Sequence, residues 1–292
     1  MSDTRANLRR KIASAGDLQS VVRTMKALAA ASVGQYEKSV QALGDAERTV
    51  QLGLGACLRQ GAAAPRAGPQ RPQPGAFNAV VFGSDQGLVG QFNEVVVEHA
   101  LEALSQLPGE ARVWAVGARA YARLADAGLR LQERLVVPTS VKAISPLVGR
   151  ILVDTEASEV VELHLFHNRP TSGGAYAPIG QRVLPLDDAW RAERAALPWP
   201  GKTLPEVLGG TETVLRGLIR ESLFISLFRA CAESLASENA SRLAAMQRAD
   251  KNIDELLEGL NRTFQRLRQS SIDEELFDVV SGFEALSKEN SR

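Results

Sequence analysis

The segment best suited to chemistry is a glycine-rich turn, GSDQGLVG at residues 83–90, which follows a short apolar run. A turn of this kind between a strand and a helix can hold phosphate on its backbone N–H groups. However, the Gly-Lys-Ser/Thr triplet of a P-loop does not follow it, and the dinucleotide pattern GxGxxG is missing. We therefore interpret the segment as a tight turn whose glycines permit positive φ, with Ser84 or Asp85 capping the next helix.

Other residue types used in catalysis or metal binding are few and poorly spaced. The two cysteines, Cys57 and Cys231, fit no metal-ligand spacing and are expected to be free thiols. His164 and His167 fall in an expected strand, where a spacing of three places them on opposite faces. No Ser/His/Asp or Cys/His set stands in the sequence context of a nucleophile. The sequence thus predicts no catalytic residue, no metal ligand and no cofactor.

Composition limits the class of protein that must position such residues. The formal net charge is zero, with 34 Lys and Arg against 34 Asp and Glu, which argues against a nucleic-acid binder. Aromatic residues make up only 5% of the chain, and abundant Ala, Leu, Glu and Arg are typical of long helices. No run of about 18 apolar residues is present, and the first residues lack the apolar core of a signal peptide. We expect no transmembrane segment.

The 13 prolines divide the chain, because all of them lie between Pro65 and Pro205. A proline inside a helix costs roughly 3 kcal/mol, which means that the proline-free ends can form long helices. Four parts are expected: an N-terminal helix over 1–60, a proline- and glycine-rich linker over 61–75, a central domain over 76–200, and a C-terminal helix over 205–288.

The N-terminal segment repeats apolar residues at alternating steps of three and four. A sustained period of 3.5 residues is typical of a left-handed coiled coil. Gln19, Lys26 and Glu47 interrupt the stripe, and five glycines each weaken the helix by up to about 1 kcal/mol. The apolar members are Leu8, Ile12, Ala15, Val22, Ala29, Val33, Tyr36, Val40, Leu43, Val50, Leu54 and Cys57.

The C-terminal segment continues the same pattern over a longer distance. A helix of about eighty residues would be about 120 Å long at about 1.5 Å per residue, which exceeds the first helix. Much of its apolar stripe must therefore find a partner elsewhere. The stripe contains Val207, Val214, Leu218, Leu223, Leu227, Cys231, Leu235, Leu243, Met246, Ile253, Leu256, Leu260, Phe264, Leu267, Ile272, Leu276, Val280, Phe283 and Leu286.

Between the two ends, short apolar runs alternate with helical patterns, which predicts a small parallel or mixed sheet with helices on its faces. The fold class is therefore α+β or α/β: a central α/β domain with a small mixed sheet, and a long antiparallel two-helix coiled coil formed by both ends. Strands are expected over 77–83, 111–117 and 131–137, a paired set over 160–170 and 180–187, and helices over 92–104, 118–128 and 141–155.

Both ends and the glycine-rich turn resemble the γ subunits of F-type ATP synthases. The most specific similarity is SENASRLAAM at 237–246, and RQSSIDEE at 268–275 follows at the family's usual spacing. The runs 8–32 and 82–93 resemble the family's N-terminal pattern and its Ser-Asp-Arg-Gly-Leu-Cys-Gly turn. Gln86 and Val89 depart from that turn, and the segment 33–43 lacks the usual basic cluster. These departures resemble a divergent, second-operon bacterial branch proposed to pump sodium ions.

The resemblance implies a central rotor shaft rather than an enzyme. In that family the coiled coil stands inside a ring of catalytic β and non-catalytic α subunits, and the α/β domain sits at the foot. There it would meet the ε-type subunit and the membrane c-ring. Rotation would couple ion flow to ATP synthesis or hydrolysis at the partner sites. The implied location is the cytoplasmic side of the inner membrane, and the coupling ion, proton or sodium, stays open.

The resemblance also implies contact residues. Arg268 and Gln269 are expected to touch a loop of a catalytic subunit. Arg23, Met25 and Lys26 are expected to face the lever end of those subunits. The alternative for each is an ordinary coil position or a solvated charge.

Two other classes of protein remain open from the sequence alone. A nucleotide-binding enzyme would use the 83–90 turn and bind ATP as an isolated chain. A coiled-coil scaffold would form a defined homo-oligomer without other partners.

Overall fold

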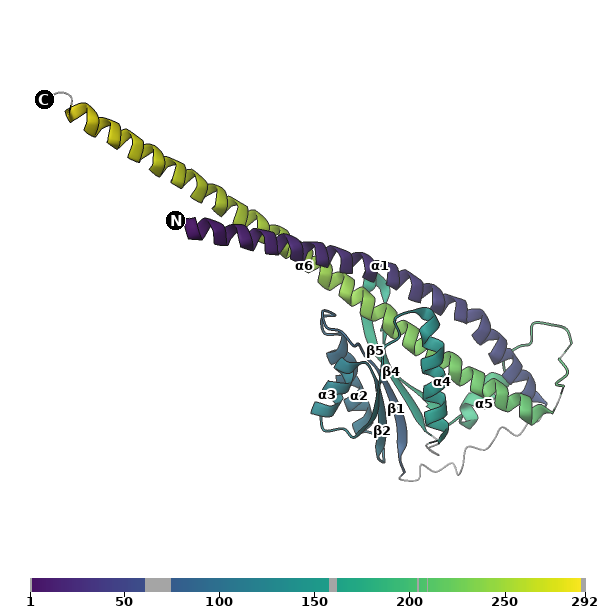
Figure 1. Ribbon diagram of the computed structural model, residues 1–292. Helices are drawn as coiled ribbons and strands as arrows, with labels where there is room; N and C mark the ends of the chain where they lie inside the picture. The colour runs from purple at the N-terminus through teal and green to yellow at the C-terminus, as the bar shows by residue number, and fades with distance from the viewer. Residues whose placement is uncertain (1, 61–74, 158–161, 204, 209, 290–292) are drawn as a thin grey trace. The chain divides into compact units, whose positions relative to one another are not determined.

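The computed structural model describes residues 2–60, 75–157, 162–203, 205–208 and 210–289. The chain forms two compact units: an end unit of Met1–Leu28 with Leu243–Arg292, and a sheet unit of Ala29–Arg242. Two long helices, α1 (Ser2–Arg59) and α6 (Thr211–Glu289), contribute to both units (Figure 1). The linker expected over 61–75 lies outside the described residues except for its last position.

The sheet unit contains a five-stranded mixed sheet in the order β3-β2-β1-β4-β5. The first four strands run parallel, and β5 pairs antiparallel with β4. This arrangement confirms the small mixed sheet predicted from the sequence. The strands are β1 (Phe77–Phe82), β2 (Ala111–Val116), β3 (Leu131–Leu135), β4 (Leu163–Pro170) and β5 (Tyr176–Leu184).

Helices cover both faces of this sheet, which explains why every residue of the central strand β1 is buried. On one face α2 (Phe92–Ser105) and α3 (Ala118–Asp126) pack over a core that includes Val81 and Phe166 (Figure 1). On the other face α4 (Val141–Ala157) packs with parts of α1 and α6 over a second core. The short helix α5 (Asp188–Ala195) was not expected from the sequence; its first turn is capped by Asp187, which accepts a hydrogen bond from the Trp190 N–H.

Within each unit, α1 and α6 pair antiparallel. In the end unit Arg5 contacts Ser271 and Lys26 contacts Asp250, and in the sheet unit Glu47 pairs with Arg229. In α1, every apolar position of the predicted stripe and its three polar interruptions are buried or half-buried. The helical ends and the central mixed sheet therefore confirm the predicted fold class.

The stripe of α6 differs from the prediction in three ways. The helix begins at Thr211 rather than 205, which leaves Val207 before its first turn. Leu256 is 53% exposed, because the neighbouring Leu257 packs against the end-unit core instead. Beyond Ser271, the residue that Arg5 contacts, Ile272, Leu276 and Val280 are all exposed, and the side chains of Phe283 and Leu286 lie outside the described set.

Over the residues that the structure describes, no helix is long and apolar enough to cross a membrane.

Candidate functional site

The glycine-rich turn lies at the carboxyl end of β1, between β1 and α2. In the strand order β3-β2-β1-β4-β5, the chain continues from β1 to its neighbour β2, and from β4 to its neighbour β5 on the other side. The strand order therefore reverses between β1 and β4. Open α/β sheets commonly bind ligands in the crevice at such a topological switch point. The question is what fills this position here.

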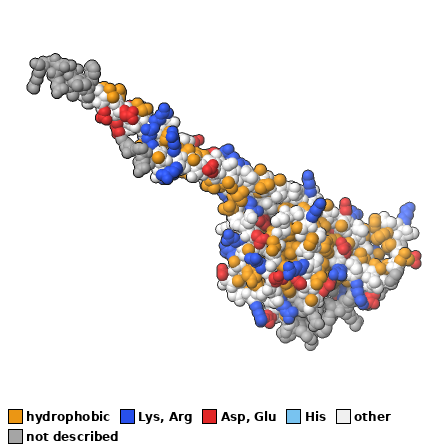
Figure 2. Space-filling view, viewed as in Figure 1, with side chains coloured by type: hydrophobic (Ala, Val, Ile, Leu, Met, Phe, Trp, Pro, Cys, Tyr) orange, Lys and Arg blue, Asp and Glu red, His pale blue; other side chains and the backbone are white. Residues whose placement is uncertain are grey.

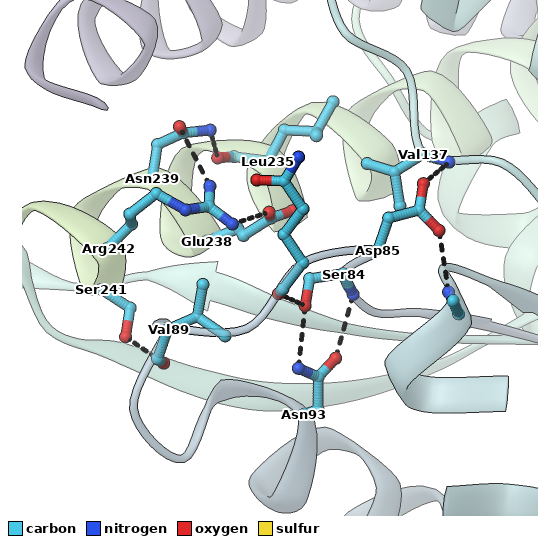
Figure 3. Close-up of polar contacts among 12 residues, drawn as sticks. Ser84, Asp85, Val89, Asn93, Val137, Leu235, Glu238, Asn239, Ser241 and Arg242 are labelled. Carbon is cyan, nitrogen blue, oxygen red and sulfur yellow. Dashed lines mark hydrogen bonds and ion pairs between the residues drawn. The ribbon is translucent and has the colours of Figure 1, made fainter. Parts of the chain in front are cut away.

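The turn is held by its own side chains and by α2. The Ser84 N–H donates to Asn93 Oδ1 at 2.9 Å, and Asn93 Nδ2 donates to Ser84 Oγ at 2.8 Å (Figure 3). The Asp85 carboxylate accepts from the backbone N–H groups of Ala118 at 2.8 Å and Val137 at 2.9 Å. The prediction that Ser84 or Asp85 caps the next helix was therefore wrong. Asp85 accepts from the first residue of α3 instead, and Ser84 binds the side chain of an α2 residue.

The open side of the turn is covered by α6. Ser241 Oγ donates to the carbonyl oxygen of Val89 (Figure 3). Ser237 Oγ donates to the carbonyl oxygen of Asn168 at 3.0 Å. Asn168, near the end of β4, in turn donates to the carbonyl oxygen of Phe92 at 2.8 Å. The crevice between β1 and β4 is thus closed by hydrogen bonds to a helix.

A buried ion pair lies on the same stretch of α6. Arg242 donates to Glu238 at 2.7 Å, and the two side chains are 12% and 7% exposed. Burial raises the pKa of Glu238, and the nearby Asp85 carboxylate adds to the increase, although Arg242 opposes it. Burial also raises the pKa of the Tyr36 hydroxyl from the α1 side. The site is therefore a tightly packed polar junction between α1, α6 and the turn.

A second junction ties α6 to β4. The buried Glu233 carboxylate receives His167 Nε2 and Arg169 Nε, each at 2.8 Å. Burial alone would raise the pKa of Glu233, but the hydrogen bonds from His167 and Arg169 outweigh it and hold the pKa below its ordinary value. His167 lies on the α6 face of β4, whereas His164 contacts Phe77 and Phe166 of the core under α2. The two histidines point to opposite faces, as the sequence predicted.

These contacts leave the turn unsuited to phosphate. The Asp85 carboxylate already occupies the first N–H of α3, and its negative charge would repel an anion there. Within the described ranges, no three His, Cys, Asp or Glu side chains gather where they could hold a metal ion. The chemistry of this region is structural: it locks α6 to the sheet.

Two of the expected contact residues lie on the surface of the end unit. Arg268 and Gln269 are both exposed on α6, next to the half-buried Leu267. Arg9 of α1 lies 5.7 Å from the ring centroid of Phe264, one turn earlier on α6. Figure 2 shows basic, acidic and apolar side chains interspersed along this unit. Arg268 and Gln269 are therefore accessible to a partner.

The N-terminal expected residues have partners inside the end unit. Lys26 Nζ lies 2.6 Å and Arg23 Nε 3.1 Å from the carboxylate of Asp250. The hydrogen bond from Lys26, joined by that from Arg23, holds the pKa of Asp250 below its ordinary value. Met25 packs beside Met246 in the apolar cluster of this unit. Only Arg23, whose side chain is 57% exposed, is largely accessible.

Sequence reasoning missed the partners that complete these groups. Asp250 and Glu233 were not singled out, nor were Asn93 and Asn168. The one signal that could have found Asp250 is the polar interruption of the stripe at Lys26, since a buried polar coil position needs a partner on the facing helix. Asn93 is the last residue of the run 82–93 that resembles the family's turn motif, but its bonds to Ser84 were not predicted, and Asn168 offered no local signal.

The fold and the site together define a class: a protein in which two long paired helices are joined to an α/β sheet by buried polar contacts. Comparison with known proteins identifies that class. The pattern of the family described as ATP synthase matches residues 4–286, and the chain belongs to that family. Its similar relatives are gamma chains, which are non-catalytic subunits of a rotary ATP synthase.

Two relatives illustrate the similarity over the whole length. The ATP synthase gamma chain of Methylorubrum extorquens (strain PA1) is 26% identical, and the alignment covers 96% of this chain and 98% of the relative. The gamma chain of Granulibacter bethesdensis is 29% identical with the same coverage. Among solved structures, a rotor chain of the Euglena gracilis mitochondrial ATP synthase is similar in fold, with a TM-score of 0.67 at 15% identity over 93% of this chain and all (100%) of that one.

Proposed function

We propose that this chain is the central rotor shaft of an F-type ATP synthase, and that it couples ion flow through a membrane sector to ATP synthesis or hydrolysis at partner subunits. The family match over residues 4–286 is the observation that carries the proposal. The closed switch point supports it further, because a nucleotide-binding enzyme would need that crevice open. No observation favours the homo-oligomeric scaffold.

We propose that the partners are catalytic β and non-catalytic α subunits around α1 and α6, with the ε-type subunit and the c-ring at the central domain. The exposed end of α6 supports the first part. Phe277 is 72% exposed, and Leu276 60%. Large apolar side chains at this density on one helix indicate a surface that another chain covers. For this role we propose the same four parts, namely 1–60, 61–75, 76–200 and the C-terminal part predicted over 205–288, whose helix begins at Thr211.

Within this function, Arg268 and Gln269 are the proposed contacts to a loop of a catalytic subunit. Both side chains are exposed, which leaves their hydrogen-bonding groups available to a partner. Arg23 is proposed to share this role toward the lever end. Met25 and Lys26 have partners within the paired helices, so we propose that they hold Arg23 in position for this contact.

Two finer assignments belong to this proposal. The departures at Gln86 and Val89 from the family's turn motif support membership of the divergent sodium-type branch. Membership of the family supports a position peripheral to the inner membrane, on its cytoplasmic side. The coupling ion is chosen by the ring subunit. Its ion-binding residues, read from the partner gene, would support or exclude the sodium branch.

The contact pair can be tested in membrane vesicles that contain the assembled complex. Because Arg268 and Gln269 are exposed, Arg268→Ala and Gln269→Ala should leave the chain folded and lower ion transport per ATP hydrolysed. Arg262→Ala is a matched control, since Arg262 is an exposed arginine on α6 that pairs only loosely with Glu258, at 4.0 Å. Equal coupling in all three variants would count against the contact.

A further inference from the structure

A small, partly open cavity lies in the sheet unit between α1, α6 and the β4–β5 edge of the sheet. Its volume is about 110 Å³, and its lining includes Glu47 of α1, His167 and Arg169 of β4, and Ser226 and Arg229 of α6. The cavity belongs to neither the turn nor the end unit. Its residues are not used by the proposed rotor function, and the inference below does not depend on that function.

The charges around the cavity come in pairs. Arg229 pairs with Glu47, and Arg169 pairs with Glu233 at 2.8 Å. A guanidinium carries five N–H donors in a planar fork. One carboxylate uses only part of that fork, which leaves donors from two opposite walls, β4 and α6, available to a further acceptor.

Two buried nitrogen atoms on this lining have no hydrogen-bond partner among the described residues: His167 Nδ1 and Arg229 Nε. The His167 side chain is 1% exposed. Buried polar atoms are usually paired, so each of these two nitrogens calls for a partner.

Whether each unpaired nitrogen donates or accepts a hydrogen bond follows from the chemistry of its side chain and of the groups around it. His167 Nε2 lies 2.8 Å from the carboxylate of Glu233, and a carboxylate only accepts. Nε2 therefore carries the proton, and in the neutral ring Nδ1 is an acceptor. Arg229 Nε always donates. An occupant that satisfies both must donate one hydrogen bond and accept another.

We propose that this cavity binds a protonated oxyanion of the hydrogen phosphate class. Its hydroxyl would donate to His167 Nδ1, and its other oxygens would accept from Arg229 and Arg169. The volume corresponds to about three or four water molecules at roughly 30 Å³ each, which suits one small tetrahedral anion. Arginine forks match phosphate oxygens in geometry and charge. The bound anion would join α6 to β4.

The test is structure determination of the full chain, alone or in its complex, in three buffers at pH 8.5: inorganic phosphate, sulfate and chloride. At this pH inorganic phosphate is present mainly as hydrogen phosphate, which keeps one proton to donate. The charged groups facing His167 are Glu233 and Arg229 from α6, Arg169 from β4 and Glu47 from α1. We expect tetrahedral density in phosphate, with oxygens about 3 Å from both unpaired nitrogens.

Sulfate has the same shape but no proton to donate at this pH, and it should occupy the cavity at least tenfold more weakly. Arg229→Gln should lose the phosphate density, and Arg150→Gln, which alters an exposed arginine paired with Glu133, should keep it. Separate water-like peaks in phosphate identical to those in chloride would overturn the proposal. Equal occupancy by sulfate and phosphate would overturn the requirement for a protonated anion. The wild-type comparison between buffers needs no variant to fold.

Discussion

At the scale of single residues, Asp85 joins the turn to two distant segments of the sheet unit. Its carboxylate accepts from two backbone groups that lie 33 and 52 residues further along the chain. Such long separations explain why sequence reasoning placed Asp85 in the turn but gave it the wrong role. A capping rule considers only the helix that follows in sequence. The N–H groups that Asp85 binds lie after β2 and β3, and they come close to it because β1, β2 and β3 are parallel neighbours.

We expect Asp85→Ala to lower the free energy of unfolding by at least about 1 kcal/mol, because two backbone donors lose their acceptor. Urea denaturation followed by tryptophan fluorescence would measure the change. Asp126→Ala alters an exposed carboxylate at the end of α3 and should stay within about 0.5 kcal/mol of wild type. Equal effects of the two substitutions would show that the Asp85 bonds contribute nothing.

The buried Glu238 predicts a distinct pH dependence. Its folded pKa is raised above the ordinary value of about 4.3, so the folded chain holds the proton more tightly than the unfolded chain. This contribution to stability is fully present below that value and is lost as the pH rises through the folded pKa. Relative to wild type, Glu238→Gln should therefore gain stability as the pH rises from about 4 to about 8. Denaturant titrations at several pH values would measure the difference.

The exposed Glu255 provides the control, since Glu255→Gln removes a carboxylate whose side chain is 66% exposed. Its stability relative to wild type should change little over the same pH range. A flat difference curve for Glu238→Gln would mean that Glu238 titrates as an ordinary surface carboxyl.

At the scale of elements, the apolar period of the sequence predicted which faces of the two long helices pair, but it did not predict where α6 begins. In α1 the stripe is buried or half-buried at every position, including Gln19, Lys26 and Glu47. In α6 the predicted stripe included Leu256, but Leu257 packs in the core. The covered positions 246, 250, 253, 257, 260, 264, 267 and 271 keep alternating steps of four and three, so the period holds and only the choice between two neighbouring leucines was wrong. The strands β1, β2 and β3 were predicted from their apolar runs, whereas α5 was missed because its short polar sequence has no apolar period.

Glycines within α1 offer a matched pair of substitutions. A side chain at Gly34 would meet nothing within 4 Å, whereas one at Gly55 would lie 2.6 Å from the carbonyl oxygen of Arg194. Because alanine is the better helix former, Gly34→Ala should stabilise the chain by about 0.5–1 kcal/mol. Gly55→Ala should destabilise it, since the backbone of Arg194 must move. Thermal unfolding of both variants would measure the contrast, and stabilisation by Gly55→Ala would contradict the packing described here.

At the scale of the whole molecule, each part of the chain supports a subunit rather than an enzyme. The crevice where a doubly wound sheet would bind a nucleotide is closed by Ser237 and Ser241 of α6. In the end unit, the apolar surface lies beyond the last contact of α1. Burying that surface requires another chain, so we expect the isolated protein to aggregate.

The most direct test is to purify the tagged chain from its own cells under mild conditions and identify the bound proteins by mass spectrometry. We expect recovery of catalytic and non-catalytic ATPase subunits in excess over this chain, with ATP hydrolysis in the purified fraction. A stable homodimer without ATPase partners, or ATP binding by the chain alone, would contradict this expectation.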